Sequence, residues 1–108
     1  MTEALKGKDR RHLRGLGHAL EPVVRIGKGG VDAGVVRAVD DALTSHELIK
    51  VKLTAEAPDD RHDVAERLAT ELRAHVAQVI GGTILLYRRN PEKPKIKVGG
   101  VGKSTVES

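Results

Sequence analysis

Apolar residues recur along this chain with two different periods, and each period predicts a different kind of element. In some segments valines and leucines repeat at the spacing of an amphipathic helix. In others, apolar residues alternate with polar ones or form short unbroken runs, as in strands. The patterns predict helices over residues 5–17, 32–45 and 59–74, and strands over residues 22–27, 47–53, 76–80 and 83–88. Gly81-Gly82 would join the last two strands as a hairpin.

The predicted order α-β-α-β-α-β-β indicates an α/β fold, a two-layer sandwich with three helices and a four-stranded mixed sheet. Each β-α-β connection should be a right-handed crossover between parallel strands, with both crossover helices on the same face. Lys50 and Lys52 alternate with apolar residues in the second strand, and Arg25 does so in the first. The sheet face away from these helices is therefore expected to be basic, unless the first helix folds over it.

The composition narrows the class of protein. A chain of 108 residues has room for one domain with a core of modest size. It contains no cysteine, which excludes disulfides and thiolate chemistry. Tyr87 is its only aromatic residue apart from histidines, which argues against binding single-stranded nucleic acid by base stacking. No apolar run could span a bilayer and no signal-peptide core is present, so we expect a cytoplasmic protein without membrane contact.

Charge is segregated along the chain. Residues 1–30 and residues 88–108 each carry a net charge of +4, whereas residues 31–60 carry −4. Such segregation gives a directional field whose positive side attracts polyanions, although an ordinary solvated surface fits the same numbers. From Asn90 onward prolines, glycines and lysines interrupt the pattern. We therefore expect a domain over residues 1–89 and a flexible basic tail over residues 90–108.

A glycine loop, Gly27-Lys28-Gly29-Gly30, separates the first predicted strand from the second predicted helix. Its amides could hold an anion, which Lys28 would also attract. The loop is not a P-loop, because no Ser or Thr follows the lysine, nor a dinucleotide fingerprint, because residue 32 is Asp. A G-x-x-G loop remains, which either contacts a phosphate backbone or is a tight turn without a ligand. Asp32 would cap the helix, leaving the loop amides and Lys28 for phosphate.

Several motifs occur in order along the chain. They are Leu13-Arg14-Gly15-Leu16, Ile26-Gly27-Lys28-Gly29-Gly30, His46-Glu47-Leu48-Ile49-Lys50-Val51, Val79-Ile80-Gly81 and Leu85-Leu86-Tyr87-Arg88. Together they resemble the CRM domain, in particular the bacterial stand-alone proteins of the YhbY type, over Leu5 to Arg89. The chain departs from the family at Gly7, where members often have a Ser or Thr helix cap. The tail after Asn90 has no counterpart that we can assign.

The resemblance implies a fold akin to the C-terminal domain of translation initiation factor three. It also implies RNA binding, with the G-x-x-G loop used much as KH domains use theirs. Bacterial members are associated with precursors of the large ribosomal subunit, and plant relatives act in organellar intron splicing. The expected partner is therefore ribosomal RNA, bound by a monomer that has no catalytic activity, cofactor, metal or small-molecule substrate.

The expected RNA site combines the resemblance with the basic positions. It consists of the loop residues Gly27, Lys28, Gly29 and Gly30, of Lys8, Arg10, Arg11 and Arg14 in the first helix, and of Arg25, Lys50 and Lys52 on the sheet.

A second function stays open at this point. The acidic second helix, with Asp40, Asp41 and Glu47, could dock on ribosomal or assembly-factor proteins. Carboxylate clusters such as Asp59-Asp60 could also hold magnesium, although solvated helix faces and first-turn acids are the commoner explanation. The five histidines include no i, i+4 pair, and no spacing suggests a catalytic triad.

Overall fold

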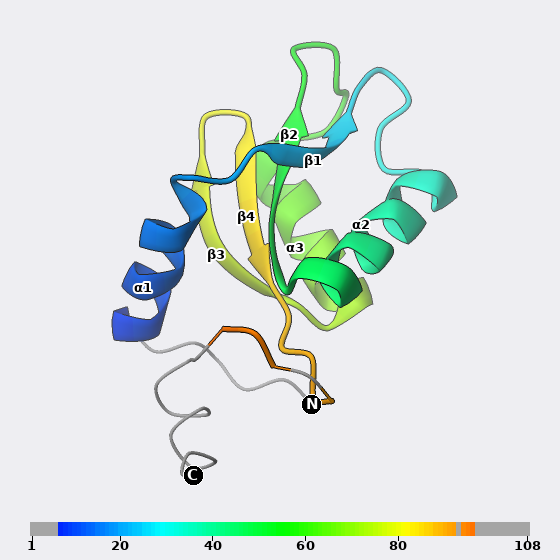
Figure 1. Ribbon diagram of the computed structural model, residues 1–108. Helices are drawn as coiled ribbons and strands as arrows, with labels where there is room; N and C mark the ends of the chain where they lie inside the picture. The colour runs from blue at the N-terminus through cyan, green and yellow to red at the C-terminus, as the bar shows by residue number, and fades with distance from the viewer. Residues whose placement is uncertain (1–6, 93, 97–108) are drawn as a thin grey trace, which may run out of the picture.

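The structure is a computed structural model that describes residues 7–92 and 94–96, and its elements follow the predicted order (Figure 1). The helices are α1 (Gly7–Gly17), α2 (Ala33–His46) and α3 (Arg61–Leu72), and the strands are β1 (Pro22–Ile26), β2 (Leu48–Leu53), β3 (His75–Ile80) and β4 (Thr83–Tyr87). Asp32 and Asp60 cap α2 and α3, because each carboxylate accepts a hydrogen bond from a first-turn amide. None of these described helices is long and apolar enough to cross a membrane.

The four strands form one mixed sheet in the order β1-β2-β4-β3. β1 and β2 are parallel, as the crossover through α2 requires, and β4 is antiparallel to both of its neighbours. The hairpin thus inserts β4 into the middle of the sheet, and β1 and β3 become its edges.

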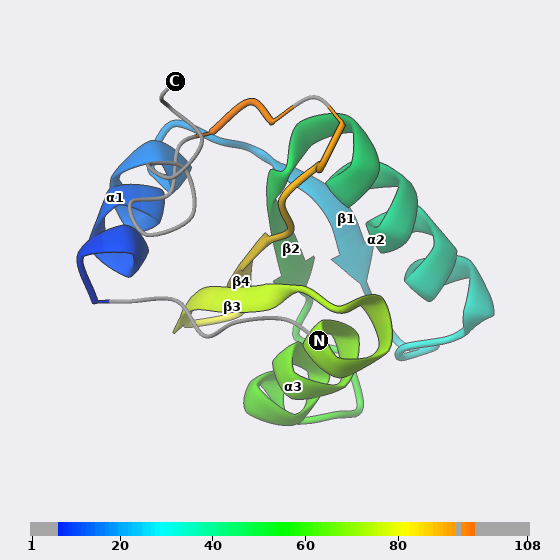
Figure 2. The ribbon, with the colours of Figure 1, turned by 90° about the horizontal axis from the view of Figure 1, so that it is seen from below.

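The main core lies between the sheet and the helices α2 and α3. Both helices cover the same face, as Figure 2 shows, which confirms the predicted sandwich. The cluster includes Val24, Ile26, Ile49, Val51, Ile84 and Leu86 from the strands and Val39, Leu43, Val64 and Leu68 from the helices. Full burial of each such side chain stabilises the fold by about 1.5–3 kcal/mol.

A second, smaller core attaches α1 to the opposite face of the sheet (Figures 1 and 2). Leu13 of α1 is fully buried against Leu48, Leu85 and Tyr87. The C-terminal end of α1 approaches so closely that a Cβ on Gly17 would lie 2.8 Å from Cδ2 of Leu85. The first helix therefore does fold over the sheet, but it covers only part of this face. We call the face of the sheet opposite α2 and α3 the open face.

The chain after β4 returns to the domain. We call residues 90–92 and 94–96 the strap; it runs from the end of β4 toward α1 (Figure 2). Three strap amides, those of Asn90, Lys95 and Ile96, donate hydrogen bonds to the carboxylate of Glu47. Asn90, Lys95 and Ile96, which lie within the expected tail, therefore contact the domain. Residues 93 and 97–108 of the expected tail lie outside the described residues.

Candidate nucleic-acid interface

The loop of residues 27–30 is a tight turn held in one shape by the fold. The Gly30 amide donates to the Gly27 carbonyl at 2.9 Å, which places Lys28 and Gly29 at the tip. The Thr54 amide donates to the Ile26 carbonyl at 2.9 Å and so ties the end of β1 to the end of β2. Gly30 has a φ of +68°, and a Cβ there would lie 3.2 Å from Cγ of Pro58. Both the conformation and the space at this position require glycine.

The tip of the loop offers hydrogen-bond donors. Lys28 and Gly29 are exposed, and no hydrogen bond within residues 7–92 and 94–96 occupies their backbone amides. The start of α2 is less available, because Oδ1 of Asp32 already accepts the Val35 amide at 2.8 Å. Asp59 lies against Gly30, which restricts an anion to the side of the loop that carries Lys28. A phosphate at this loop would therefore meet the amides of Lys28 and Gly29 and the Lys28 ammonium.

Three cations lie on the face of β1 and β2 beside this loop: Arg25 and Lys52 lie near it, and Lys50 lies opposite Pro22 at the other end of β1. The strand register pairs Arg25 directly with Lys52, and Lys50 lies two residues earlier on the same face of β2. Arg25 is exposed, the two lysines are half-buried, and none forms an ion pair with a described residue. Like charges opposite one another destabilise a sheet, so this pair favours an external anion over a role in folding. We call residues 27–30 with Arg25, Lys50 and Lys52 the loop rim.

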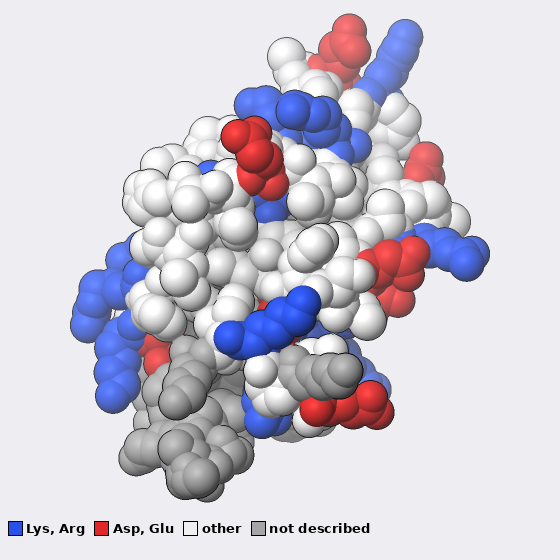
Figure 3. Space-filling view, viewed as in Figure 1, with Lys and Arg blue, Asp and Glu red and all other residues white. Residues whose placement is uncertain are grey.

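The cations of α1 form a separate group. Lys8 and Arg11 are exposed, whereas Arg10 and Arg14 are half-buried. Figure 3 shows basic side chains over the sheet near β1 and over α1, with a largely uncharged surface between them. The structure thus places two cations of the sheet near the loop but keeps those of α1 apart. A ligand would have to extend along the open face to contact both groups.

The only tyrosine is not part of this surface. Tyr87 is buried beneath α1, where its ring stacks on His75 of β3. Burial, and secondly the charge of Arg10 in α1, lower the pKa of His75. The one tyrosine of the chain is therefore not exposed for base stacking.

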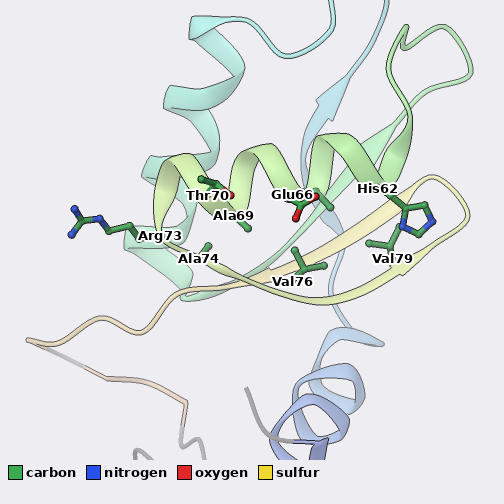
Figure 4. A pocket seen from close by; sticks show the side chains of 9 residues that line it. His62, Glu66, Ala69, Thr70, Arg73, Ala74, Val76 and Val79 are labelled. Atoms are coloured by element: carbon green, nitrogen blue, oxygen red, sulfur yellow. The ribbon is translucent and has the colours of Figure 1, made fainter. Parts of the chain in front are cut away.

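A groove of about 620 Å³ lies between α3 and the edge strand β3 (Figure 4). Its polar side chains do not converge: Arg73 points away at one end, and His62 lies beside Val79 at the other. Among the described residues, no three His, Cys, Asp or Glu side chains are grouped to hold a metal ion. The groove therefore has no arrangement of acid and base groups that suggests catalysis.

The acidic face expected on α2 is mostly engaged within the domain. Glu47 is fully buried, and Asp40 pairs with Arg88 at 2.8 Å. Asp41 is the one member of this trio that is exposed without such a role. This weakens the hypothesis of docking through α2, because Glu47 is buried and the charge of the partly exposed Asp40 is compensated by Arg88.

Arg88 and Glu47 hold elements of the interface in position, a role that the sequence pattern did not predict for either residue. The guanidinium of Arg88 donates to Oδ1 and the carbonyl of Asp40, to Oγ1 of Thr44 and to the carbonyl of Leu72, so it joins β4 to the ends of α2 and α3. Glu47 holds the strap. The only sign of this role in the sequence was that Glu47 is a charged residue between a predicted helix and a predicted strand. Its partners could not be predicted from the local pattern, because they lie 43 to 49 residues away along the chain.

The fold thus defines a class of small α/β domains, in which a mixed four-stranded sheet is combined with a lysine-bearing G-x-x-G loop between β1 and α2. Within that class the chain belongs to the CRS1/YhbY (CRM) domain family, whose model matches residues 5–88.

Individual relatives agree with this assignment. The chain is 39% identical over 94 residues to the "Probable RNA-binding protein YqeI" of Bacillus subtilis, and the aligned region covers 87% of this chain and 98% of that protein. It is 37% identical over 92 residues to the "Probable RNA-binding protein PA4753" of Pseudomonas aeruginosa, with coverages of 85% and 88%. The solution structure of the hypothetical protein SAV1595 from Staphylococcus aureus has the same fold, with a TM-score of 0.75, 39% identity and coverages of 87% and 98%.

Proposed function

We propose that this chain is a non-catalytic RNA-binding protein that binds ribosomal RNA in precursors of the large ribosomal subunit, as a monomer in the cytoplasm. The loop rim is the observation that carries the proposal, because exposed Lys28 and two loop amides to which no described residue bonds lie near Arg25 and Lys52. The names of the relatives support RNA as the ligand. The association of bacterial family members with large-subunit precursors supports the choice of ribosomal RNA.

The chemistry of the loop rim favours contacts to the sugar-phosphate backbone. Lysine, arginine and backbone amides bind phosphate oxygens, and such contacts position a protein on RNA without reading its sequence. Because Tyr87 is buried, the open face lacks the aromatic platform on which single-stranded bases stack. Specificity would then come from the shape of a structured RNA.

Binding of a structured fragment of large-subunit ribosomal RNA, measured by fluorescence anisotropy, tests this proposal. Lys28→Glu reverses one charge at the exposed tip of the loop, and we expect it to weaken binding at least about tenfold, the value of one charge-assisted contact. Arg37→Glu is the matched control, because it reverses one charge on the exposed surface of α2. It should change the affinity less than about twofold, with both variants folded by circular dichroism.

Equal losses of RNA affinity in Lys28→Glu and Arg37→Glu would contradict the proposal. They would show that the loop lysine contributes only the general attraction that any surface cation contributes. Capture of bound partners from lysate, with and without ribonuclease, separates RNA binding from protein docking. Partners that remain after RNA digestion in the wild type and in Lys28→Glu would favour docking.

A further inference from the structure

The attachment of α1 to the sheet depends on the small core. An isolated helix of 11 residues that contains glycines is unstable in water, so α1 needs tertiary contacts to persist. Its one buried leucine, Leu13, packs in a cluster of five buried side chains, and Leu20 and Ile96 complete that cluster at its edge. Ile96 comes from the strap, so the segment after β4 helps to form the core beneath the basic helix.

The strap is held in place by one buried carboxylate. Oε2 of Glu47 accepts the Asn90 amide at 2.6 Å, and Oε1 accepts the amides of Lys95 and Ile96 at 2.8 and 2.9 Å. Glu47 itself is 0% exposed and has a φ of 65°, which is unusual for a residue other than glycine. The Lys95 ammonium adds a hydrogen bond to the Ser45 carbonyl at the end of α2.

A carboxylate is the group that this arrangement requires. All three partners are N–H donors, so both oxygens must accept, and hydrogen bonds to an ionised acceptor are roughly twice as strong as neutral ones. Glutamine has nearly the same shape but carries one amide NH₂. In whichever orientation it lies, that NH₂ would meet a strap amide with no acceptor between them.

We propose that Glu47 is a positioning residue: it binds the strap so that Ile96 completes the small core and α1 is fixed, with its arginines, on the open face of the sheet. Only the consequence for RNA rests on the proposed function. The position of α1 and its dependence on Glu47 are properties of the domain alone.

Hydrogen–deuterium exchange, resolved by element in the full chain, tests this inference without RNA. In Glu47→Gln we expect the amides of α1 to exchange about tenfold or more faster, the effect of losing one hydrogen bond to a charged group. Ile96→Ala should do the same with Glu47 intact, because it removes the side chain that the strap supplies. Amides of α2, α3 and the central strands should keep their protection in both variants. Asp41→Asn, a change at an exposed carboxylate, is the matched control and should leave α1 unchanged.

Unchanged protection of α1 in Glu47→Gln and Ile96→Ala would overturn the inference, as would equal acceleration in every element, which would assign Glu47 to the main core. RNA binding provides a separate readout. Loss of affinity in both variants, with α1 loosened, would support the inference, whereas Lys28→Glu should lose affinity with α1 fully protected. If the wild type bound no RNA while α1 still loosened in both variants, the role of Glu47 would stand and the proposed function would fail.

Discussion

Tyr87 is buried beneath α1 together with its hydroxyl group. It is 2% exposed, its ring centroid lies 6.2 Å from that of His75, and its hydroxyl has no hydrogen-bond partner in the structure as described. A buried hydroxyl without a partner costs about 1–3 kcal/mol. The residue therefore contributes apolar packing beneath α1, and the cations around it supply the chemistry of the open face.

The ionisation of Tyr87 gives a prediction that a single spectroscopic probe can check. Burial, and secondly the negative charge of Glu47, raise its pKa from 10.0 to about 12. The folded state thus keeps the phenol protonated where the unfolded chain loses the proton. The stability linked to this proton is fully present below pH 10 and is lost as the pH rises toward 12, by about 2–3 kcal/mol in total.

Ultraviolet absorbance during a pH titration measures this pKa directly, because the chain has one tyrosine. Ionisation of the native protein near pH 10 would contradict the burial of Tyr87. Denaturant melts of Tyr87→Phe serve as the control. This variant should be at least as stable as the wild type, and between pH 10 and 12 it should lack the loss that the wild type shows.

At the scale of elements, the ends of α2, α3 and β4 meet at one guanidinium. Arg88 donates four hydrogen bonds to groups on α2 and α3, at distances between 2.8 and 3.1 Å. A lysine cannot reproduce this set, because its ammonium is a compact group without the planar fork of arginine. The junction of the two helices with the sheet therefore depends on the shape of the side chain as well as on its charge.

Arg88→Lys should accordingly lower the free energy of unfolding by about 2–3 kcal/mol, since at least one hydrogen bond to a charged partner is lost and other acceptors are left less well satisfied. Arg67→Lys is the matched control. Arg67 pairs with Glu71 at 2.9 Å on the exposed surface of α3, and such pairs contribute about 0–1 kcal/mol. Urea melts measure both values. Losses of similar size in the two variants would show that Arg88 does not join these elements.

Local pattern predicted the helices and strands, because each has a clear apolar period. It also identified the loop and the alternation of Lys50 and Lys52, which depend on neighbours in sequence. It did not predict that Glu47 ends α2 with a positive φ rather than starting the next strand. Nor did it predict the path of the strap. Both depend on contacts between residues more than forty positions apart, which no local period records.

At the scale of the whole molecule, the segregated charge of the sequence becomes two basic groups in space. The basic side chains near β1 and those over α1 lie on the same side of the sheet but are separated by a surface without basic side chains, on which an acidic side chain lies beside the group near β1 (Figure 3). Charge segregation along the sequence could not distinguish one patch from two, because the position of α1 is set by the small core and the strap. A structured RNA that contacts both groups must therefore extend along the open face.

If the loop rim binds the phosphate backbone of RNA, the affinity for RNA must depend on salt concentration, and removal of one loop cation must change that dependence. The logarithm of the wild-type binding constant for a structured ribosomal RNA fragment should fall steeply and linearly with the logarithm of salt concentration. Lys28→Gln should reduce this slope by about 0.7–0.9, the value of one neutralised phosphate, and Arg37→Gln should leave it unchanged. A flat slope in the wild type, or an equal reduction in the two variants, would contradict the account.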